Sequence, residues 1–239
     1  MNVYKTDFIA DLLKTNSYPG RGIIVGKSED AKCAAIAYFI MGRSDNSRNR
    51  VFVKRDGALY TEPYDYSRVS DPSLIIYSAL REIDNKIIVT NGDQTDTIYD
   101  GIASGGDMRS ALRTREFEPD APNLTPRISG VLDFKDGDFT YEMSILKSAS
   151  SDGCACNRYF YEYSPIAGLG HFIHTYVTDG NPLPTFTGEP ERIYIPSDID
   201  KFADDIWNNL DGENKISLYV CYVDLDGGER RERIVNKNK

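Results

Sequence analysis

The run AAIAYFIMG at residues 34–42 constrains the fold of this chain more than any other stretch. Its side chains are almost wholly apolar, so a strand formed here has no face suited to water. Strands of this kind are typical of sheets that are covered on both sides. We therefore expect residues 34–42 to form a strand that is buried on both faces.

Other segments predict further strands and a few helices. Strands are expected at 22–26, 34–42, 50–54, 58–61, 86–90, 127–134, 139–148, 158–164, 170–178, 216–225 and 230–235. Helices are expected from Thr6 to Leu13, Asp71 to Arg81, Thr95 to Ala103, Asp107 to Glu116 and Ser197 to Asn209. The order lacks regular βαβ alternation, which favours an α+β fold: two mainly antiparallel sheets packed together, with helices outside.

Length and charge limit what the chain can be. With 239 residues and no repeat or low-complexity linker, residues 1–239 are expected to form a single domain. A net charge of −9 argues against nucleic acid as a partner, because nucleic-acid binding needs a basic surface. We see no apolar run of membrane-spanning length and no signal peptide, and the four cysteines fit a reducing compartment. The expected location is cytoplasmic, without membrane contact.

Metal and cofactor motifs are not found in the sequence. Cys154 and Cys156 have no second pair at a spacing suited to zinc. His171 and His174 are three apart in an expected strand, so they project to opposite faces. There is no GxGxxG, P-loop, GxSxG or HExxH string. The sequence therefore predicts neither a metal site nor a cofactor.

A cluster of arginines stands out against the acidic background. The segment MGRSDNSRNRVFVKR carries Arg43, Arg48, Arg50 and Arg55 within thirteen positions. Guanidinium groups bind phosphate oxygens in pairs, and a loop at a strand end brings several of them together. A solvated basic patch is the alternative on pattern alone.

The stretch IVTNGDQTDTIYD at residues 88–100 joins an expected strand to an expected helix. The side chains of Asn91, Thr95 and Thr97, together with the free N–H groups of a helix start, can form a rim for an anion or a polar heterocycle. Asp93 and Asp96 are equally good helix N-caps, which is the structural alternative.

A third candidate lies in FEPDAPNLTPR at residues 117–127, whose three prolines exclude a helix interior. Glu118 is followed by Asp120 in this stiff loop, and Arg127 ends it. A carboxylate held on a rigid backbone suits general acid–base catalysis, and Arg127 can tune its pKa. A surface glutamate in a loop is the more common outcome for such a residue.

Taken in order along the chain, these strings resemble the archaeal-type inosine monophosphate (IMP) cyclohydrolases. The resemblance is strongest from Tyr18 to Ile128 and looser in the extended C-terminal half. The matching strings are Gly20-Arg21, Arg43-Ser44 with Asn49-Arg50, Asp71-Pro72 with Tyr77 and Arg81, Asn91-Gly92 with Thr95-Asp96-Thr97-Ile98, Glu118, Thr125-Pro126-Arg127-Ile128 and His174-Thr175-Tyr176.

The resemblance implies a four-layer α-β-β-α sandwich like that of N-terminal-nucleophile hydrolases. No Cys, Ser or Thr opens the first core strand, so an autoprocessed nucleophile is not expected. The implied reaction closes the purine ring of 5-formamidoimidazole-4-carboxamide ribonucleotide, giving IMP and water, without a cofactor.

The resemblance also implies roles for individual residues. Tyr77, Glu118 and Arg50 are the expected catalytic residues, with Tyr77 at the formyl oxygen, Glu118 as base or acid and Arg50 at anionic groups. The expected substrate-binding residues are Arg21, Arg43, Asn91, Gly92, Thr95, Asp96 and Arg127. The position of Asp93 then favours a cap.

Two other functions stay open at this stage. The scaffold can serve as a non-catalytic purine-nucleotide-binding or regulatory module, or as an amidohydrolase with Cys33 as an internal nucleophile. The expected ligand of the cyclohydrolase, and of the binding module, is a small purine ribonucleotide. Exposed edges of antiparallel sheets often pair, so the sequence also allows a homo-oligomer.

Overall fold

A computed structural model describes residues 4–69 and 76–238, and its central element is the apolar run that the sequence singles out. Cys33–Met41 forms strand β2, and all nine of its residues are buried. The prediction of a strand buried on both faces is confirmed. Strands lie on both sides of β2 in a six-stranded antiparallel sheet, here called sheet A.

Sheet A has the strand order β11-β10-β1-β2-β12-β13. Its strands are β1 (Arg21–Lys27), β2, β10 (Leu169–His174), β11 (Glu191–Tyr194), β12 (Lys215–Asp224) and β13 (Arg230–Asn236). The strands that neighbour β2 come from opposite ends of the chain. Strand β1 pairs with β10, and β2 pairs with β12, so each of these two strands has one partner that follows it by more than 140 residues.

Sheet B has seven antiparallel strands in the order of the chain, from β3 to β9. They are β3 (Arg50–Arg55), β4 (Ala58–Pro63), β5 (Tyr77–Ile83), β6 (Lys86–Thr90), β7 (Arg127–Lys135), β8 (Asp138–Ser148) and β9 (Cys156–Tyr163). Both residues of the Asp56-Gly57 turn have positive φ, which matches a tight hairpin between β3 and β4.

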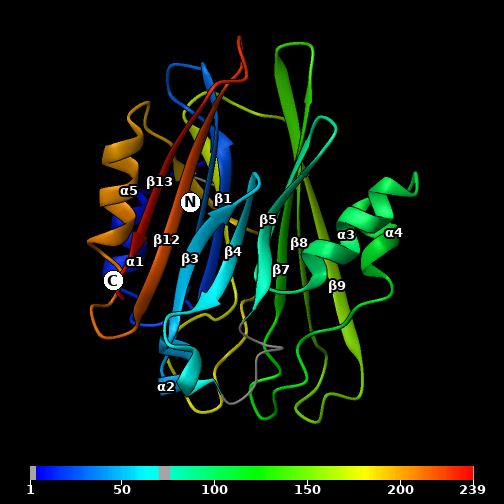
Figure 1. Ribbon diagram of the computed structural model, residues 1–239, viewed down its shortest axis with the longest axis vertical. Helices are drawn as coiled ribbons and strands as arrows, with labels where there is room; N and C mark the ends of the chain where they lie inside the picture. The colour runs from blue at the N-terminus through cyan, green and yellow to red at the C-terminus, as the bar shows by residue number, and fades with distance from the viewer. Residues whose placement is uncertain (1–3, 70–75, 239) are drawn as a thin grey trace.

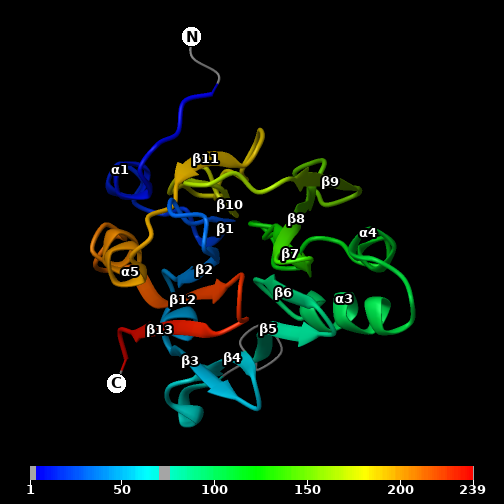
Figure 2. The same cartoon turned by 90° about the horizontal axis from the view of Figure 1, so that it is seen from above.

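The helices in the described residues are α1 (Ile9–Lys14), α2 (Asp45–Arg48), α3 (Gln94–Ala103), α4 (Met108–Leu112) and α5 (Ile199–Trp207), with a 3₁₀ turn at Tyr66–Arg68. Of these helices, four flank the outer faces of the two sheets and α2 lies at the lower end of β3 and β4 (Figure 1). Seen from above, α1 and α5 lie beside sheet A, and α3 and α4 lie beside sheet B (Figure 2).

Three apolar clusters hold these layers together. The largest fills the space between the sheets, with Ile36 from sheet A and Val89 from sheet B among its members. A second packs α1 and α5 on sheet A, and a third packs Ile98 and Met108 on the outer face of sheet B. Burial of apolar side chains on both faces of each sheet gives the α+β sandwich that the sequence predicts.

The predicted helix from Asp71 to Arg81 is wrong over the part that can be compared. Tyr77–Ile83 is strand β5, which pairs with β4 and β6; residues 71–75 lie outside the described part of the chain. The run SALRE has good helix propensity. Hydrogen bonding to β4 on one side and β6 on the other outweighs this preference. Without β5, sheet B would be split into two separate parts.

Three helix boundaries also differ from expectation. The N-terminal helix begins at Ile9 rather than at Thr6, because Asp7 exchanges backbone hydrogen bonds with β11 and holds the chain extended. Helix α4 ends at Leu112, where the Arg158 guanidinium donates hydrogen bonds to the carbonyls of Leu112 and Arg115. At α5 the cap is Asp198, one residue after the predicted Ser197.

The outer edge of sheet B is closed at β3 by side chains from the other sheet. Asn236 at the end of β13 donates to the Phe52 carbonyl and accepts from the Phe52 N–H. Asn238 donates to the carbonyls of Arg48 and Arg50. These amides replace part of a missing neighbouring strand.

Candidate functional site

The stretch between β6 and α3 is a tightly bonded turn. The hydroxyls of Thr90 and Thr95 lie 2.6 Å apart, so one donates to the other, and both lie within hydrogen-bond range of the Gly92 carbonyl. Both threonines are fully buried. Thr95 was predicted to bind substrate, and in the structure its hydroxyl is engaged within the turn.

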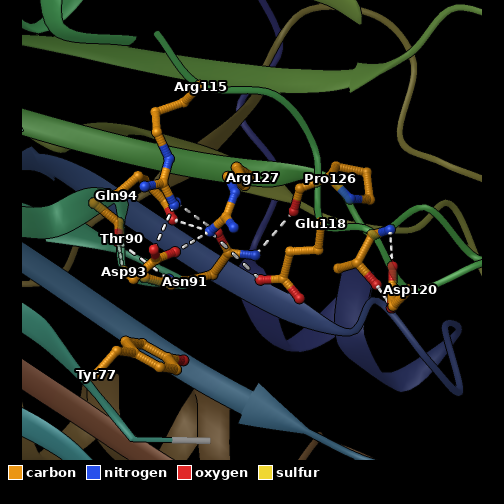
Figure 3. A network of polar contacts seen from close by, with 12 residues as sticks. Tyr77, Thr90, Asn91, Asp93, Gln94, Arg115, Glu118, Asp120, Pro126 and Arg127 are labelled. Carbon is orange, nitrogen blue, oxygen red and sulfur yellow. Dashed lines mark hydrogen bonds and ion pairs between the residues drawn. The ribbon is translucent and has the colours of Figure 1, made fainter. Parts of the chain in front are cut away.

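Asn91 and Gln94 connect this turn to β7. The Asn91 amide donates to the Pro126 carbonyl and accepts from the Ile128 N–H, both at 2.9 Å. Gln94 donates to the Asn91 side-chain oxygen and accepts from Arg127 Nη1 at 2.8 Å. The two amides therefore fix Arg127 relative to the turn (Figure 3).

Asp93 occupies the N-cap position of α3, but its side chain makes no capping bond. Its carboxylate instead pairs with Arg127 and with Arg115. Although burial acts in the opposite direction, these two arginines hold the pKa of Asp93 below its usual range. Asp93 is thus an anchor for Arg127, and the predicted capping bond is not formed.

Glu118 lies beside this cluster and is almost fully buried, with 5% of its surface exposed. The nearest cation is Arg127, whose Nη1 is 3.8 Å from Oε1, and within the described residues no group donates a hydrogen bond to the carboxylate. Burial raises the pKa of Glu118 above its usual range, although Arg21 and Arg127 oppose the effect. A buried carboxyl with spare hydrogen-bonding capacity suits proton transfer.

Gly92 leaves the space in which these groups meet. A Cβ at this position would lie 2.6 Å from Gln94 Oε1, 2.7 Å from Arg127 Nη1 and 3.2 Å from Glu118 Oε1. Any side chain at Gly92 would displace Arg127 from the Glu118 carboxylate. The turn therefore requires glycine for close approach.

Glu118 owes its position to the proline-rich loop. Its N–H donates to the Thr125 carbonyl at 2.9 Å, and Asp120 accepts from both the N–H and the hydroxyl of Thr125. The Thr125 hydroxyl also bonds to the Tyr176 hydroxyl at 2.6 Å, which links this loop to sheet A. Asp120 therefore supports the loop rather than sharing a proton with Glu118.

Two further arginines, Arg50 and Arg21, belong to the site. Arg50 is 1% exposed and donates to the carbonyls of Ser47 and Met41. Burial and repulsion from Arg21 lower the pKa of Arg50. Arg21 is only partly buried, but its Nε is enclosed and has no hydrogen-bond partner among the described residues.

Arg21 is the common neighbour of the predicted catalytic groups. Although burial disfavours its charge, Tyr176, Glu118 and Tyr77 raise its pKa. Arg21 is thus within electrostatic range of Glu118, Tyr77 and Arg50. An anion would relieve the repulsion between the two arginines.

Tyr77 begins β5 and lies between the sheets with 6% of its surface exposed. Its hydroxyl is 2.8 Å from that of Tyr38 on β2. Figure 3 shows Tyr77 facing the cluster of Arg127 and Glu118, with its hydroxyl end turned to the side on which Glu118 lies.

Other predicted residues lie outside this cluster. Asp96 pairs with Arg81 on the outer face of sheet B, and half of its side chain is exposed. Arg43 pairs with Asp179 at the rim and lies over the Tyr18 ring. Arg48 donates to Gly42 and Asn214, so the structure brings Arg50, rather than Arg48, to the other site residues.

Three residues of the site were missed from the sequence: Tyr38, Gln94 and Arg115. Tyr38 is hidden in the apolar run, and Gln94 and Arg115 are polar residues in surface-like strings. Pairing across strands and loops brings them to the site, and no local spacing signals it. Tyr38 could have been found as the one hydroxyl in a run otherwise suited to the core.

The described residues contain no group of three or more His, Cys, Asp or Glu side chains that could hold a metal. Cys154 is exposed, and His171 and His174 contact different groups, Tyr141 and Glu191. Within the same residues, no helix is long and apolar enough to cross a membrane.

Comparisons with known proteins extend over most of this architecture. A family model described as "IMP cyclohydrolase-like protein" matches residues 18–228. The IMP cyclohydrolase of Methanopyrus kandleri is 38% identical over 120 residues, which are 48% of this chain and 59% of that protein. That of Methanocaldococcus jannaschii is 26% identical over 219 residues, which are 88% and 96% of the two chains. Several of the matches thus span little more than half of the relative's length.

Proposed function

Since this chain belongs to the IMP cyclohydrolase-like family, we propose that it closes the purine ring of 5-formamidoimidazole-4-carboxamide ribonucleotide to give IMP and water. The observation that carries the proposal is the buried Glu118 carboxyl, free of hydrogen-bond donors in the described residues and adjacent to Arg21 and Arg127. Tyr77, at the start of β5, is the third proposed catalytic residue.

The reaction proceeds in two steps. The carboxamide nitrogen forms a bond to the formyl carbon, while an N–H proton passes through Glu118 to the formyl oxygen. The C–O bond of the resulting tetrahedral intermediate then breaks. The oxygen leaves as water with a second proton from nitrogen, and a C=N bond forms in the ring that the first step closed. No atom changes oxidation state overall, so the chemistry needs no redox cofactor.

Each residue has a stated part in this scheme. Glu118 accepts and returns the proton, which its raised pKa favours because protonated and ionised forms are then closer in free energy. Tyr77 donates a hydrogen bond to the formyl oxygen as it gains negative charge. Arg50 and Arg21 bind anionic groups of the ribonucleotide, and this binding holds the two reacting substituents in contact.

Some of the predicted binding residues lie next to the reacting groups, and others support them from behind. Gly92 and Arg127 border the space next to Glu118, whereas Asn91 and Thr95 hold their positions. Arg43 is held by Asp179 and lies over the Tyr18 ring, apart from the reacting groups. The position of Asp96 beside Arg81 supports no contact with the reacting groups.

The same proposal covers the setting of the enzyme. Ring closure of this ribonucleotide belongs to de novo purine biosynthesis, and we place the protein in the cytoplasm. The two stacked antiparallel sheets between helices support an N-terminal-nucleophile-hydrolase-like fold. A homo-oligomer stays an open prediction.

Purified protein supplied with the formamido substrate tests the proposal. IMP formation is followed by ultraviolet absorbance. Glu118→Gln is expected to lower kcat by about 10²–10⁴-fold, because this is the usual contribution of general acid–base catalysis. Glu116→Gln is the matched control, since Glu116 lies two residues away with an exposed side chain and a 3.9 Å pair to Arg158.

Two results would contradict the proposal. One is wild-type turnover no greater than that of a Glu118→Gln, Tyr77→Phe double variant. The other is an equal loss of activity in Glu116→Gln and Glu118→Gln. Nucleotide binding by calorimetry without turnover would support the non-catalytic module instead.

A further inference from the structure

The hydroxyl of Tyr77 has a buried partner that the proposed mechanism does not use. Tyr38 lies in the middle of β2, is fully buried, and places its hydroxyl 2.8 Å from that of Tyr77. The two rings come from different sheets. Their contact is thus a hydrogen bond across the interface between sheets A and B.

The surroundings of Tyr38 limit where its proton can go. Its ring lies 5.3 Å from that of Phe52, and the charged groups that affect it are Arg21 and Arg50, which are donors only. Among the described residues, the Tyr77 oxygen is the one acceptor within hydrogen-bond range of the Tyr38 hydroxyl. A buried hydroxyl proton without an acceptor is unfavourable.

Tyr77 has an alternative that Tyr38 lacks. Tyr77 retains 6% exposure and faces the site, whereas Tyr38 is completely enclosed. Burial, together with Tyr77, raises the pKa of Tyr38 well above its usual value, so Tyr38 keeps its proton at any working pH. The favoured arrangement has Tyr38 donating to Tyr77, with the proton of Tyr77 directed into the site.

We propose that Tyr38 is a positioning residue, whose hydroxyl donates to Tyr77 and so fixes Tyr77 as a hydrogen-bond donor to the substrate. The inference rests on the proposed function for its catalytic consequence. The direction of the hydrogen bond itself does not depend on that function. In the absence of Tyr38, the Tyr77 hydroxyl can rotate and present a lone pair instead of a proton.

A double-mutant cycle measures the coupling. Tyr38→Phe is expected to lower kcat about tenfold with little change in KM. The same substitution made in Tyr77→Phe should lower kcat no further, because Tyr38 acts through Tyr77. Independent effects that multiply in the double variant would overturn the proposal.

A matched control separates positioning from stability. Tyr222 lies on the neighbouring strand β12, is fully buried, and donates to the Pro196 carbonyl at 2.6 Å on the other side of sheet A. Tyr222→Phe is expected to lower stability by a similar amount and to leave kcat unchanged. An equal loss of kcat in both variants would assign Tyr38 a purely structural role.

A second measurement decides the donor without turnover. In protein with ¹³Cζ-labelled tyrosine in mixed H₂O and D₂O, a slowly exchanging hydroxyl gives two resolved isotope-shifted lines and a rapidly exchanging one gives a single line. We expect two lines for Tyr38 and one for Tyr77. Two lines for Tyr77 would refute the inference, because its proton would then be held between the two hydroxyls. Failure of wild-type turnover, by contrast, would refute the proposed function and leave this result intact.

Discussion

Asn91 offers the sharpest test of how the site is supported. It was predicted to bind substrate, but both ends of its amide are bonded to protein: it donates to Pro126, and accepts from Gln94 and from the Ile128 N–H. The residue is 2% exposed. Asn91→Ala removes three buried hydrogen bonds at once, and Gln94 alone keeps a second partner, the Ile128 carbonyl.

The magnitude follows from the two groups left unpaired, the Pro126 carbonyl and the Ile128 N–H. Each such buried group costs about 1–3 kcal/mol, so we expect a loss of about 4 kcal/mol in the free energy of unfolding. With a urea dependence of about 3 kcal/mol per M, this lowers the unfolding midpoint by about 1 M. Urea denaturation followed by fluorescence measures the shift.

Asn85→Ala is the matched control, because Asn85 also donates to a side chain and a backbone carbonyl, but at an exposed turn. Its midpoint should change by less than about 0.3 M. Asn91→Asp retains both acceptor bonds and should fall between the two. Equal shifts for Asn91→Ala and Asn85→Ala would refute the view that Asn91 anchors the turn to β7.

Three further outcomes are expected. Burial raises the pKa of Glu118, so ionisation of Glu118 costs stability. The unfolding free energy of Glu118→Gln should therefore rise relative to that of the wild type as the pH rises above 4.5. A difference that stays constant in urea titrations across pH would contradict this. Burial and Arg192 lower the pKa of His171 from 6.5 to about 4, so stability should be lost as the pH falls through this window, by up to about 3 kcal/mol, and His171→Gln should remove that loss. Arg43→Ala should change the unfolding free energy by less than about 1 kcal/mol in thermal melts, because its pair with Asp179 is exposed to solvent, and a larger change would assign Arg43 a structural role.

The sheets could be predicted from the sequence because their signals are local. The run at 34–42 and the Asp-Gly turns each specify a strand or a hairpin through properties of a few adjacent residues. Strand β5 was mistaken for a helix because its residues have helix propensity and its strand character comes from pairing with β4 and β6. Partners distant in sequence, rather than local preference, decide such segments.

Site residues, too, differ in how well the sequence alone could identify their roles. Glu118 was marked by the stiffness of its loop and Gly92 by the family resemblance, and the two lie together in the structure. The roles of Asn91 and Asp96 were harder to assign, because both bear the same kind of polar side chain in one short string. Only the direction of each side chain separates a buried anchor from an exposed partner of Arg81, and this direction depends on the register of α3 against sheet B.

The hydrogen bonds that Asn236 and Asn238 make to β3 have a practical consequence for anyone who prepares this protein. Arg50 lies on that edge strand, and its carbonyl is held by Asn238, near the C-terminal end of the chain. A purification tag fused close behind Asn238 would compete for this position and loosen the strand that carries Arg50. The activity of such a preparation should therefore be compared with that of untagged protein. A flexible Gly/Ser linker, or a tag at the opposite end, avoids the competition.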